Sequence, residues 1–203
     1  MQSPAQTRIR QGLISSSTLA TILFVPLLAV IVFAIWVSVS SISENVRFGR
    51  GVDQLVQIIS TTRHLAAKNP TMFITPGANA ILEMQHAGAS LPGQVGPNAV
   101  NAANGLSMFV KNPWDGTISA TIYKPSVIRI ETSLPARACL KSATFLARDV
   151  RGLGIQLMET RTTMQAEWQR FFDRQSTASI QAKDIEAACL QGTVTLALVI
   201  GVR

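Results

Sequence analysis

No charged residue lies between Arg10 and Glu44 in this chain of 203 residues. The centre of that stretch, residues 18–39, is one apolar block, TLATILFVPLLAVIVFAIWVSV. As an α-helix it reaches roughly 33 Å at about 1.5 Å per residue, which is enough to cross the hydrocarbon core of a bilayer. A soluble domain has no need of so long an uncharged segment, so the sequence predicts a helix that enters a membrane.

Three interpretations fit this segment, and all three export the rest of the chain. A cleaved secretory signal has an apolar core of only about 7–15 residues, shorter than this one, although Ser38 and Ser40 supply small residues for a cleavage site. A signal anchor keeps the span, with Arg8 and Arg10 holding the N-terminus in the cytoplasm. A prepilin is cut on the cytoplasmic side, here after Gly12, and retains the apolar helix.

The helical pattern continues beyond the apolar block. Apolar residues recur at helical spacing up to about Ala67, namely Ile42, Val46, Val52, Leu55, Val56, Ile59 and Leu65. We therefore expect one helix of about 50 residues, transmembrane first and amphipathic later, packed on a small antiparallel sheet in a globular head. The fold class predicted for the whole chain is α+β.

Turn chemistry and alternating patterns outline the first part of the head. Residues 69–104 are rich in Pro, Gly, Asn and Ala, and predict an ordered surface loop in which only residues 78–88 favour a short helix. The segment KNPWDGT, residues 111–117, predicts a turn with a position tolerant of positive φ. Two short alternating runs, residues 118–122 and 128–130, then predict a β-hairpin.

The later part of the head predicts helices and a final strand. Residues 133–150 read as an amphipathic helix, and a second, shorter helix begins at about Gln181. The segment ETRTTMQAEWQRFFDRQS, residues 159–176, is interpreted as an inserted amphipathic helix, and residues 193–202 as a terminal strand. The apolar stripes of the two helices comprise Cys139, Ala143, Leu146, Val150 and Leu153 in the first, and Ala182, Ile185 and Cys189 in the second.

The chain has two cysteines, Cys139 and Cys189, and each lies on the apolar face of its predicted helix. In an exported protein two cysteines allow one intramolecular disulfide, which is the pairing we predict. Such a bridge stabilises by roughly 4 kcal/mol in the chain-entropy model. The alternative is a pair of buried free thiols.

Charge gives one further hint of function. The formal net charge is +7, and removal of Arg8 and Arg10 with a leader leaves +5. Four cations, which we call the basic surface, fall on the side of the 133–150 helix and its following turn that is opposite the apolar stripe: Arg137, Lys141, Arg148 and Arg151. The wider region, residues 137–174, holds seven Arg or Lys residues against four Asp or Glu, interleaved with Phe145, Trp168, Phe171 and Phe172. Such a surface fits weak contact with nucleic-acid phosphates or an anionic cell surface; a solvated helix face over buried aromatics is the alternative.

Nothing in the sequence predicts an enzyme. His64 and His86 are isolated, without the spacing of metal ligands. Gly152 and Gly154 lack the strand before and the helix after that a phosphate-binding loop requires. We expect no catalytic residues, no cofactor and no metal.

Four motifs occur in order along nearly the whole chain: QGLISSS (11–17), NPWDG (112–116), LPARACLKSA (134–143) and EAACLQGT (186–193). With the long N-terminal helix and a late cysteine before a final strand, they make the chain resemble type IVb pilins. The likeness is greatest to thin-pilus pilins of conjugative plasmids and to toxin-coregulated pilins.

This resemblance implies a structural role. It predicts a leader over residues 1–12 that prepilin peptidase cuts between Gly12 and Leu13, a transmembrane part over 13–40, and an exported pilin αβ-roll-like head over 41–203. The Cys139–Cys189 bridge would frame the family's distal D-region. The subunit would sit in the bacterial inner membrane with its N-terminus cytoplasmic and its head periplasmic. It would then polymerise through the N-terminal helix, with itself or with other pilins, into an extracellular type IV pilus-like filament for adhesion, conjugation or secretion.

One residue departs from the family pattern. Type IVb pilins normally carry a glutamate at the fifth mature position, which pairs with a neighbour's N-terminus during assembly. Counting from Leu13, that position is Ser17. We therefore expect either a minor subunit or a filament that depends more on contacts between heads.

A different class of function also fits the layout. A signal-anchored periplasmic binding domain has the same apolar segment and an exported head, but it never polymerises. The two classes differ in processing, because only the pilin loses residues 1–12.

Overall fold

The computed structural model describes residues 16–98, 107–162, 167–175, 180–190 and 192–202, with side chains from residue 24 onward except at residues 97, 98 and 107. The fold is α+β: a long N-terminal apolar helix, a seven-stranded antiparallel sheet and one disulfide. Two compact units divide the chain, residues 1–45 and 46–203. The second unit is called the head from here on.

Helix α1 (Ser16–Lys68) is the longest element, with 53 residues. Within the head it presents one apolar stripe to the core. The buried residues of this stripe are Val52, Leu55, Ile58, Ile59, Thr62 and Ala66, which recur every three or four residues as an amphipathic helix requires. The prediction of one long helix that ends near Ala67 is confirmed.

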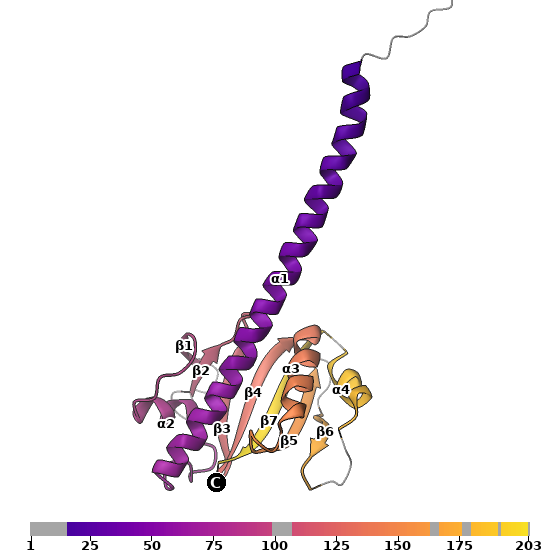
Figure 1. The fold of residues 1–203 in the computed structure, drawn as a ribbon. Coiled ribbons are helices and arrows are strands. Elements are labelled where there is room, and N and C mark those ends of the chain that lie inside the picture. Colours follow the sequence, from indigo (N-terminus) through magenta and orange to yellow (C-terminus); the bar gives the residue numbers. More distant parts are fainter. Residues whose placement is uncertain (1–15, 99–106, 163–166, 176–179, 191, 203) are drawn as a thin grey trace, which may run out of the picture. The chain divides into compact units, whose positions relative to one another are not determined.

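The seven strands form a single sheet in the order β1-β2-β3-β4-β7-β5-β6, with every neighbouring pair antiparallel (Figure 1). Their bounds are β1 Val95–Asn98, β2 Ser107–Lys111, β3 Thr117–Lys124, β4 Val127–Pro135, β5 Ile155–Thr162, β6 Gln169–Asp173 and β7 Thr193–Gly201. The last strand lies between β4 and β5, in the middle of the sheet. The sheet is therefore complete only when the C-terminal segment pairs with β4 and β5. This segment is the terminal strand that the sequence predicts.

Three shorter helices complete the head: α2 (Ala80–His86), α3 (Ala136–Arg148) and α4 (Ala182–Cys189). The ribbon places α1 and α3 over the same face of the sheet (Figure 1). Asn79 fixes the start of α2, because its Oδ1 accepts a hydrogen bond from the Leu82 backbone N–H at 2.9 Å. Pro135 precedes α3 with a φ of −62°, which suits entry into a helix. All three helices lie where helices are predicted, but residues 133–135, predicted as the start of the second one, form the end of β4, where they pair with β7.

Strands β3 and β4 form the predicted hairpin, and their side chains alternate between the core and the opposite face. Ser126, in the turn between them, has a φ of 63°. The predicted turn before β3 is also present, with Asp115 at a φ of 61°. Asn112 holds this turn together, since its Oδ1 accepts from the backbone N–H groups of Trp114 at 3.0 Å and Gly116 at 2.9 Å.

The prediction for residues 159–176 is wrong. The segment is not a helix: β5 occupies its beginning up to Thr162, and β6 lies at Gln169–Asp173, paired antiparallel with β5. The physical reason is that β5 pairs along its whole length with the central strand β7. Strands β1 and β2 were also not predicted; β1 contains a glycine and a proline, which are both depleted in strands.

Candidate functional site

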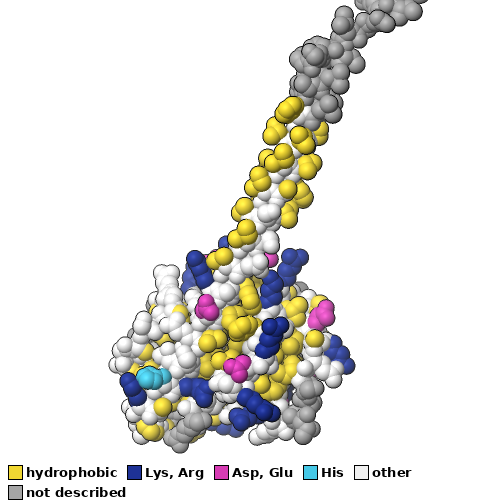
Figure 2. Space-filling model, in the orientation of Figure 1, with side chains coloured by type: hydrophobic (Ala, Val, Ile, Leu, Met, Phe, Trp, Pro, Cys, Tyr) yellow, Lys and Arg dark blue, Asp and Glu magenta, His cyan; other side chains and the backbone are white. Residues whose placement is uncertain are grey.

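The apolar part of α1 is the first candidate for a functional surface. Between Phe24 and Val39 its large apolar side chains are 44–67% exposed. On the face that Figure 2 shows, apolar side chains are the most prominent ones along this segment. Residues 24–68 include an apolar window of 18 residues, none of which is buried. By length and composition α1 is therefore a candidate for a single membrane span.

The predicted cleavage site, Gly12 and Leu13, lies outside the described residues. Ser17 lies in the first turn of α1, and only its backbone is described. The processing of this end therefore stays a prediction.

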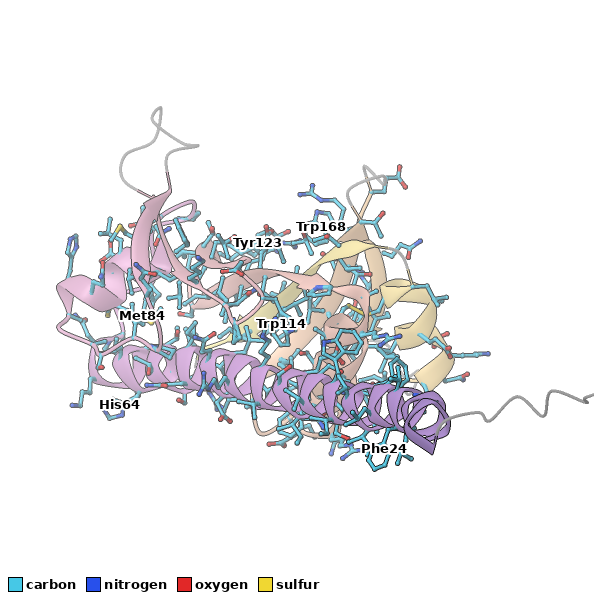
Figure 3. All side chains as sticks on the ribbon, turned by 90° about the horizontal axis from the view of Figure 1, so that it is seen from above. Phe24, His64, Met84, Trp114, Tyr123 and Trp168 are labelled. Carbon is cyan, nitrogen blue, oxygen red and sulfur yellow. A yellow bond between two sulfur atoms is a disulfide. The ribbon has the colours of Figure 1, made fainter. Side chains whose placement is uncertain are left out.

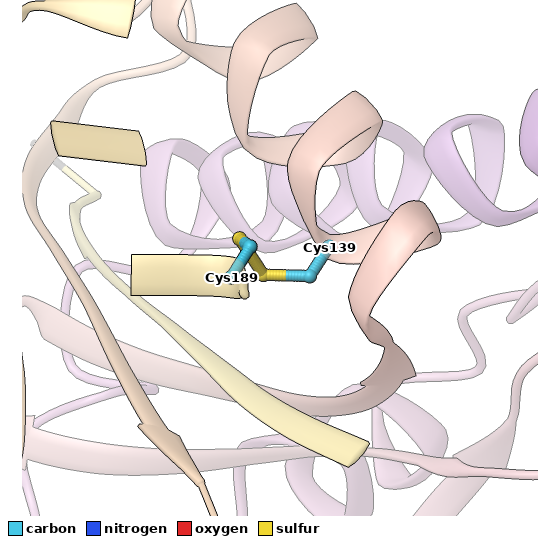
Figure 4. Close-up of a disulfide and its surroundings, with 2 residues drawn as sticks. All are labelled: Cys139 and Cys189. Atoms are coloured by element: carbon cyan, nitrogen blue, oxygen red, sulfur yellow. A yellow bond between two sulfur atoms is a disulfide. The ribbon is translucent and has the colours of Figure 1, made fainter. Parts of the chain in front are cut away.

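The disulfide joins Cys139 of α3 to Cys189 at the end of α4, with the two Cα atoms 5.7 Å apart (Figure 4). Both residues are buried, at 0% and 2% exposed. The predicted pairing is confirmed. The bridge joins α4 to α3. It thereby closes a loop of chain that contains β5 and β6. Ala182 is exposed, so the buried face of α4 differs from the predicted stripe; it comprises Ile185, Ala188 and Cys189.

All four residues of the basic surface are exposed. Arg137, Lys141 and Arg148 follow one side of α3, and Arg151 lies in the turn after it. Figure 2 shows Lys and Arg side chains over the face of the head that carries α1 and α3. The Nζ of Lys141 is 5.8 Å from the centroid of the Phe48 ring on α1. Anion binding by these residues stays a prediction.

The aromatic residues predicted to interleave with the basic surface are divided between two sides of the head. Phe145 is on α3 and is 45% exposed. Trp168, just before β6, lies on the side of the sheet away from α1, as does Tyr123 (Figure 3). The structure therefore does not bring Trp168 to the basic surface.

Trp168 instead belongs to a charged network that sequence reasoning missed. Its ring contacts two guanidinium groups, with the Cζ atoms of Arg129 and Arg161 at 4.2 Å and 4.6 Å from the ring centroid. Arg129, on β4, also donates to Glu131 Oε1 at 2.7 Å and to Glu159 Oε2 at 3.0 Å. Stacking and pairing together hold the Arg129 guanidinium in one orientation.

Glu159 is the centre of that network. Its side chain is 9% exposed, and its second oxygen is 3.6 Å from Arg170 Nε. Arg170 in turn pairs with Asp173 at 3.1 Å. Arg129 is on β4 and Glu159 is on β5, the two neighbours of β7 in the sheet. Their ion pair therefore connects β4 to β5 across β7. Strand-like alternation of charged residues in 157–161 is the only sequence signal for it.

A groove of about 620 Å³ lies beside this network. Val127, Leu157 and Val199 contribute apolar side chains to it, and Tyr123, Lys124 and Arg174 contribute polar groups. Lys124 Nζ is 5.4 Å from the centroid of the Tyr123 ring. The groove has the mixed lining of a small-ligand site, although it lies on an open sheet face.

Across the described residues there is no group of three or more His, Cys, Asp or Glu placed to hold a metal ion. His64 and His86 are both exposed. Comparisons of this chain with family models, with curated proteins and with solved structures find no match.

Proposed function

We propose that this chain is a pilin-like structural subunit, of the type IVb kind, that polymerises through α1 into a type IV pilus-like filament. Prepilin peptidase would remove residues 1–12, and α1 would hold the subunit in the bacterial inner membrane until assembly. The head would face the periplasm and later the outside of the cell. The filament would serve adhesion, conjugation or secretion.

The observation that carries the proposal is that the two parts of α1 differ in which of their apolar side chains are buried. Its later part supplies the core stripe of the head, whereas residues 24–39 expose large apolar side chains around the helix. A helix of this kind needs an apolar environment outside the head. A bilayer supplies it before assembly, and the helices of neighbouring subunits supply it in a filament.

The head supports the proposal in a second way. A subunit of an extracellular filament must remain folded without chaperones and in an oxidising environment. The buried Cys139–Cys189 bridge and the central position of β7 both resist opening of the head. The order of the long helix, the Asn112–Gly116 turn, the α3 cysteine and the late cysteine follows the pilin motifs described above.

Ser17 limits how strongly the helices alone would hold a filament together. Without a carboxylate at this position, a neighbour's α-amino group gains no charged partner inside the apolar bundle. Packing of apolar side chains against other helices competes with nearly equal contact with lipid. We therefore expect a minor subunit, or a filament in which contacts between heads contribute much of the stability.

The second candidate is a signal-anchored periplasmic binding domain that does not polymerise. The groove beside Tyr123 favours it, because a 620 Å³ opening with apolar, amide and cationic lining has the size of a ligand site. In that case α1 would act only as an anchor.

Processing separates the two candidates. We expect intact-mass measurement of the chain from cells with prepilin peptidase to show loss of residues 1–12. Gly12→Leu should leave the full-length precursor, because the peptidase needs a small residue before the cut. Gln11→Leu, a similar change one position earlier, is the matched control and should be processed. Normal processing of Gly12→Leu, or a full-length wild-type chain, would contradict the proposed function.

A further inference from the structure

A groove of about 620 Å³ lies on the side of the sheet that faces away from the head part of α1. Its floor consists of Val127 on β4, Val199 on β7 and Leu157 on β5. The strands are in register here, because Leu157 is opposite Val199 on one side and Asp173 of β6 on the other. The floor is therefore an apolar strip that crosses the middle of the sheet.

One aromatic ring and two amides stand beside this floor. Tyr123 is 53% exposed, and its ring lies on the same side of the sheet (Figure 3). Gln156 packs against β7, where a Cβ built on Gly201 would be only 2.5 Å from Gln156 Nε2, so the glycine leaves room for this amide. Gln175 supplies the second amide. Both amides can donate and accept hydrogen bonds, which suits a ligand rich in hydroxyl groups.

Two exposed cations, Lys124 and Arg174, line opposite ends of the groove. Lys124 is the last residue of β3, and its Nζ lies beside the Tyr123 ring. Arg174 directly follows β6. In the described part of the chain, the ion pairs of this face join Arg129 and Arg170 to acids and include neither Lys124 nor Arg174. Both cations can therefore pair with an acidic ligand without breaking an ion pair of the head.

The acids of this face already have partners. Asp173 lines the groove, but its Oδ2 pairs with Arg170 at 3.1 Å and its Oδ1 accepts from the Gln175 backbone N–H at 2.9 Å. Glu131 and Glu159 belong to the network of paired residues around Trp168. Three other acids of this half of the head do not line the groove: Glu167, Asp184 and Glu186. Repulsion of an acidic ligand by the groove is therefore limited to a carboxylate that is already paired.

The spacing of the two cations points to a ligand with acidic groups along its length. Lys124 on β3 and Arg174 after β6 are four strand spacings apart, roughly 19 Å at about 4.8 Å each. We propose that the groove binds an oligosaccharide of carboxylated sugars, such as a run of uronic acids in a polysaccharide. Its carboxylates pair with the two cations, its hydroxyl groups bond with Gln156 and Gln175, and the C–H face of one sugar ring packs on Tyr123.

This inference goes beyond the proposed function and concerns the head alone. It does not depend on whether α1 polymerises or only anchors the chain. For the second candidate function it names the class of ligand that the groove would take.

A nucleic acid fits the groove less well than a carbohydrate does. Single strands are bound by series of aromatic rings on which successive bases stack. Among the described residues that line the groove, Tyr123 is the only aromatic one, and the nearby Trp168 ring is engaged by two guanidinium groups. The backbone N–H groups of Arg174 and Gln175, which could hold a phosphate, already donate within the head.

Saturation-transfer difference NMR of the full chain tests the proposal, in zwitterionic micelles that contain no sugar detergent. The probe is tetragalacturonate, and its fully methyl-esterified form is the uncharged control. We expect tetragalacturonate to bind at millimolar concentration and the ester to bind more weakly by about tenfold or more, because esterification removes the charge-assisted contacts.

Two pairs of variants locate the binding. Lys124→Gln/Arg174→Gln should weaken binding of tetragalacturonate by about tenfold or more. Arg148→Gln/Arg151→Gln removes the same charge from the basic surface and should change the Kd by less than about twofold, because salt screens distant charges. Tyr123→Ala should weaken binding by about fivefold, whereas Tyr123→Phe keeps the ring and should retain the affinity. Near-UV circular dichroism checks that each variant is folded.

Four results would overturn the proposal. The first is no binding of tetragalacturonate at millimolar concentration, and the second is equal binding of its methyl ester. The third is an equal loss of affinity in the Arg148→Gln/Arg151→Gln control. The fourth is equal or tighter binding of tetra-aspartate or of a thymidine tetranucleotide, because the groove would then recognise charge alone or a nucleic acid. None of these results bears on the processing at Gly12, so failure of this inference and failure of the proposed function are distinguishable.

Discussion

Helix α1 is continuous from Ser16 to Lys68, yet its two halves have different partners. Between Phe24 and Val39 the large apolar side chains are 44–67% exposed. In the head, Leu55, Ile58 and Ile59 are at most 2% exposed. The first half is apolar on all sides, whereas the second has one apolar stripe.

The difference shows that helix formation and helix function have separate causes in this chain. Backbone hydrogen bonds are the same in both halves. The second half is held by the sheet and α3 through its stripe, so its stability is that of the head. The first half has no such buried stripe, and the proposed function places it in lipid or among other helices. Substitutions in the two halves should therefore report on different processes.

The largest effect should come from the bridge that closes the head. Cys139→Ala/Cys189→Ala should lower the free energy of unfolding of the head by about 4 kcal/mol, because the unfolded chain regains the entropy of an open loop. Denaturant titration in detergent micelles, followed by near-UV circular dichroism, measures this. Reduced wild-type protein is the control and should lose a similar amount. A loss below about 1 kcal/mol would mean that packing alone holds α3 to α4.

A matched pair of substitutions tests the two halves directly. Ile58→Ala should lower the free energy of unfolding by about 3 kcal/mol, because it removes a fully buried side chain and leaves a cavity. Ile31→Ala makes the same change at a residue that is 45% exposed and should alter head stability by less than about 0.5 kcal/mol. The same titration measures both. Equal losses would show that the two halves share one core.

The smallest effect is expected where the head begins. Nothing lies within 4 Å of a Cβ built on Gly49, so Gly49→Ala should stabilise the helix by up to about 1 kcal/mol. Gly51→Ala should destabilise by about 1 kcal/mol, since the added methyl group displaces the Trp114 ring. Thermal unfolding of the two variants measures the difference. If both stabilise, the Trp114 ring does not pack on α1 as described.

The elements that the sequence predicts well are those with a strong local pattern. The long helix follows from apolar spacing up to Ala67, and the turn at Asn112 follows from its Asn, Pro, Asp and Gly residues. The disulfide follows because Cys139 and Cys189 are the only cysteines and both lie on apolar stripes.

The errors occur where distant residues decide the structure. Residues 159–176 contain charged and apolar residues in an order that fits a helix, but β7 pairs with β5 and thereby makes a strand. Glu159 is buried because Arg129, thirty residues earlier, reaches it. The alternation of charged residues in 157–161 indicates a strand at most and does not identify Arg129 as the partner.

The most direct test of the central claim is the composition of filaments sheared from the cell surface. Quantitative mass spectrometry should find this chain in the filament fraction with Leu13 as its first residue. Because of Ser17, we expect it either as a minor component or in filaments that dissociate when contacts between heads are removed. A chain that stays full-length in the membrane fraction and is absent from filaments would contradict the account. A dominant component in filaments that survive loss of head contacts would contradict the inference from Ser17.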